Sequence, residues 1–448
     1  MTKSMTEGKP LPLIMQFAVP LLIGNLLQQT YNIIDAAIVG RMLGAEALAG
    51  VGASSSVQFL VLGFCIGICC GFGIPVARSF GARDYEKMRS DIFHGMVLSG
   101  IVAVVLTISC VFLCPQILQL LSTPEDIYGN AYSYLVIIFM GIPFNLLYNL
   151  LAGIFRSVGD SRTPFIFLAF STVLNIGLDL FCIIVLHLGC AGAAIATVTS
   201  QAVSGILCYV YMRKKMPILK LERQECRLDG STVRMMLAMG IPMGLQYSIT
   251  AIGSMVMQSA NNGLGSVYVS GFTAGMRIKQ FAMCPFDALA TGVSVFSSQN
   301  LGAGKMKRIK SGIRQGVGIG VLYGTVAGLV IIFFGRTLSL MFVSGKDVAI
   351  LDASAKYLRC MGYFFWSLGI LNVCRMCTQG LGFSGRVIFS GLAEMVARIV
   401  VSLCFVPVFG FTAICFADQA AWLSACVYIV PVCLYCVRKC EKKLQHPE

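Results

Sequence analysis

The chain has 448 residues, of which 57% are hydrophobic and 12% are charged, with a mean hydropathy of +0.80. A soluble domain carries about 25% charged residues, so this chain has too few polar side chains to cover a soluble globule. The composition excludes that class and predicts a polytopic membrane protein. The net charge of +14 would favour nucleic acid in a soluble protein, but in a membrane protein it reports topology, and we expect no nucleic-acid partner.

Twelve stretches are long and apolar enough to cross a bilayer, which takes about 20 residues in a helix. We therefore predict an all-α protein with twelve transmembrane helices. Several of them contain a proline, such as Pro20 in the first, which removes a backbone donor and permits a bend. The spans are predicted at 13–38, 53–77, 93–114, 131–155, 165–187, 190–212, 236–258, 270–298, 313–334, 356–380, 387–409 and 412–437.

Basic residues are concentrated in alternate loops between these spans. Most of the 34 Lys and Arg residues fall in one set of loops and in the tails, while the opposite set holds only Arg41, Arg336, Lys346 and Lys356. The positive-inside rule then predicts a multi-pass protein of the cell membrane with both termini in the cytoplasm. The basic segment 213–235 is expected to be a cytoplasmic linker that contacts anionic lipid headgroups.

The second half of the chain repeats the first. Gly81-Ala82-Arg83 recurs as Gly302-Ala303-Gly304 at an offset of 221 residues, and Tyr134-Leu135 recurs as Tyr357-Leu358 at an offset of 223. Six spans in each half give both halves one orientation, so an axis along the membrane normal relates them. Many transporters are duplicated in this way, with the substrate path between the halves. The predicted domains are an N-lobe at 1–212, a linker at 213–235 and a C-lobe at 236–448.

Acidic residues inside the predicted spans are functional candidates, because a carboxylate in the bilayer core costs several kcal/mol by most estimates. Asn175 precedes Asp179 by four residues, which places both on one helix face. A carboxylate beside an amide oxygen suits Na⁺, and a buried carboxyl group can equally hold a proton. The five acidic residues are Asp35, Asp179, Asp287, Glu394 and Asp418.

The second repeat does not preserve these acids. Asp35 projects onto Val256 or Met257, and Asp179 projects onto Ser402. We therefore predict that ion coupling resides in the first half alone.

The remaining charges in spans have simpler explanations. Glu394 and Arg398 are four residues apart and can pair on one helix face, either as a structural contact or beside the substrate path. Arg277 and Lys279 are available partners for Asp287, and Asp418 is expected to be hydrated near the outer end of the last span.

Cysteines are frequent, with 19 in the chain. Cys-x-x-Cys spacing, which also occurs in metal and redox sites, is found at Cys374–Cys377 and Cys433–Cys436. No histidine stands near either pair in the sequence, so we interpret these thiols as small packing residues and expect no cofactor.

Several motifs together resemble the multidrug and toxic compound extrusion (MATE) family. The first predicted helix is similar to that of the family, and two later motifs follow in the family's order. Because the second half has no acid in its seventh or tenth helix, the chain looks closer to the DinF-like branch than to the NorM-like branch. The motifs are Ala18-Val19-Pro20, Asn25–Gln29, Tyr31–Asp35, Val39-Gly40-Arg41, Arg156–Ser161 and Gln299–Gly304.

The resemblance implies two six-helix lobes and antiport of cationic, often aromatic compounds against H⁺ or Na⁺. It also implies a cation site in the first lobe, a bend in the first helix and a tyrosine near the site. By matching positions, the cation site would be Asp35, Asn175, Asp179 and Thr197, the bend proline Pro20 and the tyrosine Tyr134.

We therefore predict a secondary active antiporter that works by alternating access, acts as a monomer on small cationic compounds and is not an enzyme. One alternative is a flippase of lipid-linked saccharides from the same broad superfamily. Such a flippase would need a cationic groove to bind the pyrophosphate headgroup. Another is an intramembrane aspartyl protease using Asp35 and Asp179. The segment Asn175-Ile-Gly177-Leu-Asp179 does not match the Gly-x-Gly-Asp motif of those enzymes, which argues against it.

Overall fold

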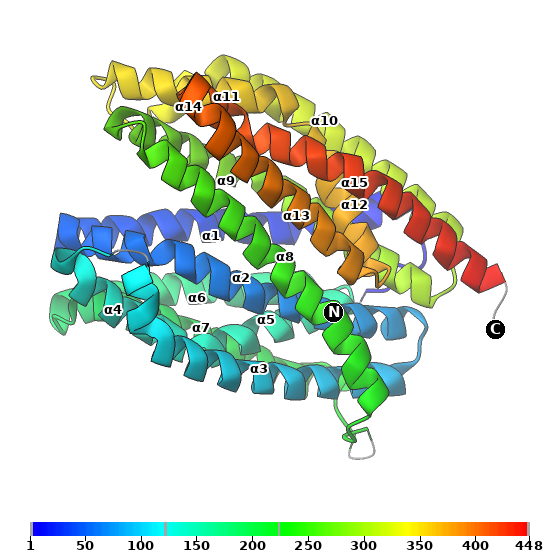
Figure 1. Ribbon diagram of the computed structural model, residues 1–448. Coiled ribbons are helices and arrows are strands. Elements are labelled where there is room, and N and C mark those ends of the chain that lie inside the picture. The colour runs from blue at the N-terminus through cyan, green and yellow to red at the C-terminus, as the bar shows by residue number, and fades with distance from the viewer. Residues whose placement is uncertain (1–2, 121–122, 223–224, 446–448) are drawn as a thin grey trace. The chain divides into compact units, whose positions relative to one another are not determined.

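The computed structural model describes residues 3–120, 123–222 and 225–445. Helices form nearly all of this part of the chain, and no strand occurs in it. Figure 1 shows the helices in chain order. The first repeat contains α1 (Pro10–Leu43), α2 (Ala45–Gly81), α3 (Tyr85–Leu120), α4 (Glu125–Met140), α5 (Ile142–Ser157), α6 (Arg162–Leu180) and α7 (Gly189–Lys215).

The helix bounds repeat as the sequence does. α2 and α9 begin and end at an offset of 221 residues, and α6 and α13 each continue into a π-helical segment, at Phe181–Val185 and Val401–Phe405. π-Helical turns are rare, so their recurrence at matching positions confirms the duplication. The second repeat contains α8 (Gly230–Asn262), α9 (Ser266–Gly302), α10 (Met306–Ser339), α11 (Val348–Phe364), α12 (Ser367–Gly380), α13 (Ser384–Val400), α14 (Val406–Phe409) and α15 (Phe411–Gln445).

Ten helices in the described residues are individually long and apolar enough to span a membrane. α4 and α5 are long and apolar enough to span a membrane only when taken together, and they are bent by 48° where they meet. Pro143 stands in the first turn of α5, where its missing N–H is tolerated, and so favours a new helix there. The predicted span 356–380 falls on α11 and α12, which meet at Phe365 and Trp366. Hydropathy does not register such breaks, which is why both pairs were expected as single helices.

Contacts divide the chain into two compact units. Unit 1 consists of Met1–Ser4 and Ile23–Gly244, and unit 2 of Met5–Leu22 and Leu245–Glu448. The first part of α1 is therefore counted with unit 2 and its remainder with unit 1. This division concerns contacts rather than sequence repetition, so the predicted lobe bounds at 1–212, 213–235 and 236–448 stay a prediction.

Each unit has its own apolar core, and glycines allow helices in it to approach closely. Phe72, Phe139 and Phe155 lie in the core of unit 1. In unit 2, a Cβ atom added to Gly369 of α12 would lie 2.3 Å from the carbonyl carbon of Gly320 of α10. Only glycine fits such a contact between helix backbones, a common packing device in membrane helices.

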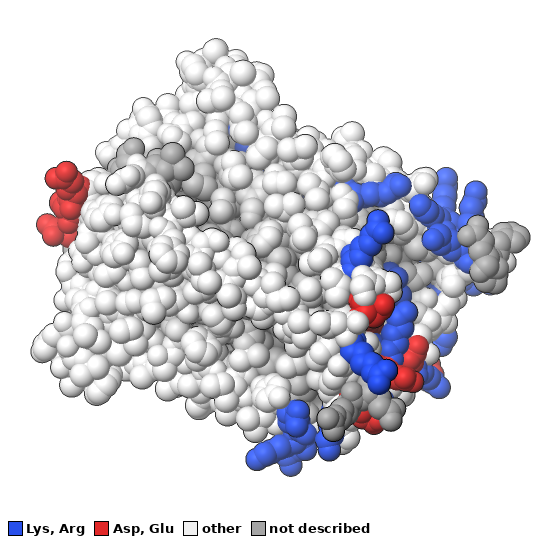
Figure 2. Space-filling view, turned by 60° about the horizontal axis from the view of Figure 1, so that its bottom comes forward, with Lys and Arg blue, Asp and Glu red and all other residues white. Residues whose placement is uncertain are grey.

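The outer surface of the helices is apolar. Phe112 of α3 is 76% exposed, and Phe333, at the matching position of α10, is 75% exposed. Figure 2 shows that charged side chains are confined to small regions and leave a wide uncharged surface. Large exposed apolar side chains on long helices are expected where lipid replaces water. The protein is thus a multi-pass membrane protein, as the composition predicts.

Candidate functional site

Three helices of unit 1 bring the predicted cation-binding residues together. Asp35 lies on α1, Asn175 and Asp179 lie on α6, and Thr197 lies on α7, which packs against α6. We call these four residues the cation cluster. Asn175 and Asp179 are 2% and 0% exposed, because their shared face of α6 is turned into the unit.

The two acids of the cation cluster face each other. The carboxyl groups of Asp35 and Asp179 lie within hydrogen-bonding reach. Two ionised carboxylates repel strongly at that separation, so the pair requires a proton or another cation. The Oδ1 atom of each acid is buried and has no hydrogen-bond partner among the described residues. Buried polar atoms are rarely left unpaired, so these oxygens are candidates for receiving a cation.

The Asn175 amide connects the acid of its own helix to α7. In one orientation its Nδ2 donates to Thr197 Oγ1 at 3.4 Å. In the opposite orientation Nδ2 donates to Asp179 Oδ2 at 3.0 Å, and Oδ1 accepts from the backbone N–H of Thr197 at 3.1 Å. The second arrangement satisfies both ends of the amide. Asn175 then serves Asp179 as a hydrogen-bond donor, and its oxygen is engaged by the backbone.

Two tyrosines and a glutamine extend the cation cluster. The hydroxyl of Tyr31 lies 3.2 Å from Thr197 Oγ1. Tyr134, which is 5% exposed, interacts electrostatically with both acids and hydrogen-bonds to Gln58 of α2. Sequence analysis did not select Tyr31 or Gln58. Tyr31 was detectable, because it precedes Asp35 by four residues and shares its face of α1, whereas Gln58 gives no comparable signal.

Pro20 lies apart from the cation cluster. It is inside α1, which continues as one helix from Pro10 to Leu43. Fifteen residues separate it from Asp35, roughly 22 Å at the rise of an α-helix. Its contacts belong to unit 2, and α1 passes into unit 1 between Leu22 and Ile23. A role of Pro20 therefore has to act through the helix rather than by contact with the cation.

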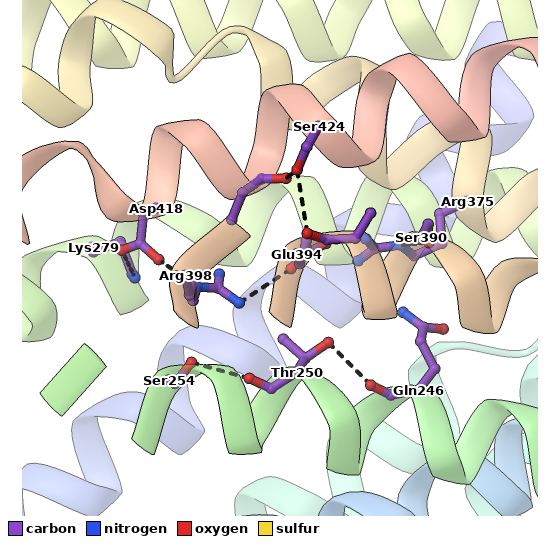
Figure 3. A network of polar contacts seen from close by, with 12 residues as sticks. Gln246, Thr250, Ser254, Lys279, Arg375, Ser390, Glu394, Arg398, Asp418 and Ser424 are labelled. Carbon is purple, nitrogen blue, oxygen red and sulfur yellow. Dashed lines mark hydrogen bonds and ion pairs between the residues drawn. The ribbon is translucent and has the colours of Figure 1, made fainter. Parts of the chain in front are cut away.

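Unit 2 contains a second buried polar cluster, shown in Figure 3. Lys279 Nζ lies 2.6 Å from Asp418 Oδ2, and Arg398 Nε lies 3.1 Å from Asp418 Oδ1. Arg398 Nη1 lies 3.4 Å from Glu394 Oε2, and Arg375 Nη2 pairs with Glu394 Oε1. We call these five residues the charge network. Their side chains are at most 10% exposed, so it is part of the interior of the unit.

The charge network corrects two expectations. Asp418 was expected to be hydrated, but it is 1% exposed and also accepts a hydrogen bond from the hydroxyl of Tyr357 at 2.9 Å. Lys279 was expected, together with Arg277, as an available partner of Asp287, but it pairs with Asp418. The reason is tertiary, since α13 packs against α15 and α9 brings Lys279 to the same place. The i,i+4 pair of Glu394 and Arg398 is present, and Arg375 joins it from α12.

The charge network and the cation cluster share one pair of matching helices and one pair of matching tyrosines. Glu394 and Arg398 lie on α13, which matches α6 of the first repeat. Tyr357 of α11 is at the position equivalent to Tyr134 of α4, because these two helices begin at an offset of 223 residues. Each tyrosine interacts with a buried acid in its own unit. Arg398 supplies a covalently attached cation on α13, whereas the matching helix α6 has the neutral Asn175 and the acid Asp179, so the two helices differ in charge.

The MatE family model matches residues 20–181 and 242–404, which make up most of the chain and lie in both repeats. The chain belongs to the MATE family. A match in each half agrees with the duplication in its helices. Members of the family are multidrug efflux transporters, and nothing in the comparisons indicates a catalytic activity for this MATE protein.

Individual MATE relatives are similar over most of their length. The probable multidrug resistance protein YpnP of Bacillus subtilis is 33% identical over 379 residues, covering 84% of each chain. The multidrug export protein MepA of Staphylococcus saprophyticus is 25% identical, covering 85% of this chain and 80% of its own. The outward-facing structure of a multidrug resistance MATE transporter superposes with a TM-score of 0.91 at 20% identity, covering 98% of both chains.

Proposed function

We propose that this protein is a secondary active antiporter that exports small organic cations in exchange for H⁺ or Na⁺. The observation that carries the proposal is the buried pair of Asp35 and Asp179, whose carboxyl groups adjoin and whose Oδ1 atoms lack partners in the described part of the chain. Such an acid pair can bind and release a cation reversibly at a site within the membrane.

Coupling requires that the cation bind one conformation better than the other. Loading the acid pair removes the repulsion between Asp35 on α1 and Asp179 on α6. The hydrogen bonds of Tyr31, Asn175 and Thr197 adjust to the changed charge, and α1 bends near Pro20. Substrate is then released to the outside, and the empty site returns inward by alternating access.

H⁺ is the better-supported coupling ion of the two. A single proton held between the two adjoining carboxyl groups would remove their repulsion without further ligands. The Asn175 amide, in its better-satisfied orientation, donates to Asp179 and offers no oxygen to a metal ion. Na⁺ would need oxygen ligands from several side chains at once. Placement in the DinF-like branch stays a prediction.

The orientation follows from the basic helix ends. α7 ends in Arg213, Lys214 and Lys215, and the last turn of α15 contains Lys442 and Lys443. By the positive-inside rule these ends, the linker and both termini face the cytoplasm of the cell. The transporter acts as a monomer in this proposal.

The experiment is efflux of a fluorescent organic cation from proteoliposomes, with a pH gradient and a Na⁺ gradient imposed separately. Asp35→Asn and Asp179→Asn should each abolish gradient-driven exchange. Asp352→Asn is the matched control, because Asp352 is 62% exposed and, among the described residues, pairs only with the exposed Arg336. Exchange at the wild-type rate in both acid variants would refute the coupling mechanism.

One observation supports the alternative of a lipid-linked saccharide flippase, and another argues against it. Three basic side chains lie inside membrane helices and could bind a pyrophosphate headgroup, namely Lys279, Arg375 and Arg398. Glu394 and Asp418 already neutralise most of that charge. Antiport is therefore preferred, and the absence of exchange under both gradients would redirect the test to lipid-linked saccharides.

A further inference from the structure

Two basic side chains of unit 2 share one aromatic ring. Lys439 Nζ of α15 lies 5.8 Å from the centre of the Phe383 ring, and the guanidinium carbon of Arg386 lies 6.0 Å from it. The same guanidinium carbon lies 4.6 Å from the centre of the Tyr435 ring. Cation–π contacts of this kind position a cation without neutralising its charge. We call these four residues the aromatic–basic cluster.

Neither cation of the aromatic–basic cluster has an acidic partner. Within residues 3–120, 123–222 and 225–445, the side chains of Arg386 and Lys439 form no ion pair and donate no hydrogen bond. Glu441, the acid nearest to Lys439 in the sequence, is held by Lys310 at 2.7 Å. Both cations are partly exposed, so their N–H donors are accessible. Arg and Lys with unused donors are the side chains that bind phosphate groups.

The cluster lies where a membrane span begins. α13 starts at Ser384, and Arg386 is in its first turn. Phe383, at the N-cap position, provides no capping hydrogen bond, and a Cβ atom added to Gly385 would meet no atom within 4 Å. Uncapped N–H groups at a helix start also favour an anion. The charge, the helix start and the open space therefore coincide at one end of α13.

An exposed apolar face of α13 leads away from the cluster. Phe389, Leu392 and Val396 are exposed, and their spacing places them on the same helix face as Arg386. The rise from Arg386 to Val396 is about 15 Å, half of the roughly 30 Å hydrocarbon core of a bilayer. Figure 1 shows α15 beside α13, and the two helices pack against each other. The apolar face thus has the length of one lipid leaflet.

We propose that the aromatic–basic cluster binds the phosphate of an anionic phospholipid whose acyl chains lie along the exposed face of α13. The apolar face favours a lipid over free phosphate, because free phosphate would leave that face unused. Two cations without an acidic partner favour an anionic headgroup over a zwitterionic one. The site goes beyond the proposed antiport and does not depend on it.

The test is native mass spectrometry of the purified protein in detergent containing equal amounts of dioleoylphosphatidylglycerol and dioleoylphosphatidylcholine. These two lipids have the same acyl chains and differ in headgroup charge. The wild type should retain phosphatidylglycerol in preference to phosphatidylcholine. Arg386→Gln and Lys439→Gln should each lower this preference roughly fivefold, the effect of one basic group near an anionic lipid surface.

The double variant Arg386→Gln, Lys439→Gln should lose most of the preference. Its matched control is Lys442→Gln, Lys443→Gln, which removes the same charge from exposed positions in the last turn of α15. This control should keep the wild-type preference to within about twofold, because its lysines have no aromatic ring among the described residues to position them. If the double variant of the cluster does not fold, the two single variants still give the result.

An equal loss in the cluster variants and in the control would overturn the site, since it would show that only the net charge of the surface matters. Inorganic phosphate, compared with chloride at equal ionic strength, should not displace phosphatidylglycerol. Displacement by millimolar phosphate would also overturn the proposal, because free phosphate would then be the occupant. Lipid retention is measured without an ion gradient, so a failure of the antiport proposal would leave this result unchanged.

Discussion

Lys279 of α9 and Asp418 of α15, which are 139 positions apart in the sequence, form a buried ion pair with 2.6 Å between Nζ and Oδ2. Asp418 also holds Arg398 and accepts from Tyr357, so one carboxylate satisfies three neighbours. Removing that carboxylate leaves Lys279 buried without an acidic partner and Arg398 paired only with Glu394, which is the costly way to break an ion pair.

Asp418→Asn should therefore destabilise the protein by about 3 kcal/mol or more. The measurement is thermal or denaturant unfolding in detergent, followed through the fluorescence of the buried Trp422. Asp352→Asn is the reference, since its pair with Arg336 at 3.2 Å is more than half exposed and should contribute about 1 kcal/mol or less. Equal stability of the two variants would show that the network is already hydrated.

An ion pair between the linker and α3 should weaken at low pH. Arg89 donates two hydrogen bonds to the Glu225 carboxylate, at 2.7 and 2.8 Å, and lowers the pKa of Glu225. A lowered pKa stabilises the fold above the ordinary glutamate pKa of about 4.3, and this contribution disappears as the pH falls through the lowered value.

Glu225→Gln should therefore be less stable than the wild type by about 1 kcal/mol at pH 7, and the difference should shrink as the pH falls below about 4. Unfolding of both proteins across this pH range measures it. Glu222 is a suitable control position, because its carboxylate is 67% exposed and lies 3.9 Å from Arg89. A difference that grows on acidification would contradict the assigned sign.

Much of this fold could be predicted because its causes are local or repetitive. Long apolar stretches identify most spans, and the recurrence of Gly81-Ala82-Arg83 as Gly302-Ala303-Gly304 reveals the duplication without tertiary information. The i,i+4 spacing placed Asn175 with Asp179 and Glu394 with Arg398. The predictions that were wrong concerned contacts between helices that are distant in the sequence. In the sequence, Asp418 lies near the predicted outer end of the last span. Its two basic partners come from α9 and α13, which pack beside α15 in the structure.

The proposed topology can be tested at Cys226. This cysteine follows Glu225 in the linker and is exposed, whereas most other thiols of the described chain are buried or partly buried in helices. A membrane-impermeant maleimide should label Cys226 in inside-out vesicles but not in intact cells. Cys226→Ser provides the background from other thiols such as the exposed Cys404. Labelling of Cys226 from outside intact cells would reverse the orientation.

Two glycines of unit 2 should respond oppositely to the same substitution. A Cβ at Gly369 would lie 2.3 Å from the backbone of Gly320, a contact that requires α10 and α12 to separate, whereas a Cβ at Gly318 meets no atom within 4 Å. Gly369→Ala should cost about 1–3 kcal/mol through overpacking, even though alanine is the better helix former. Gly318→Ala keeps the propensity gain of up to about 1 kcal/mol and should be neutral or stabilising. Thermal unfolding of the two variants side by side separates packing from propensity. If both were stabilised equally, α10 and α12 would be looser than their backbone contact indicates, and the glycines would not be what holds the helices close.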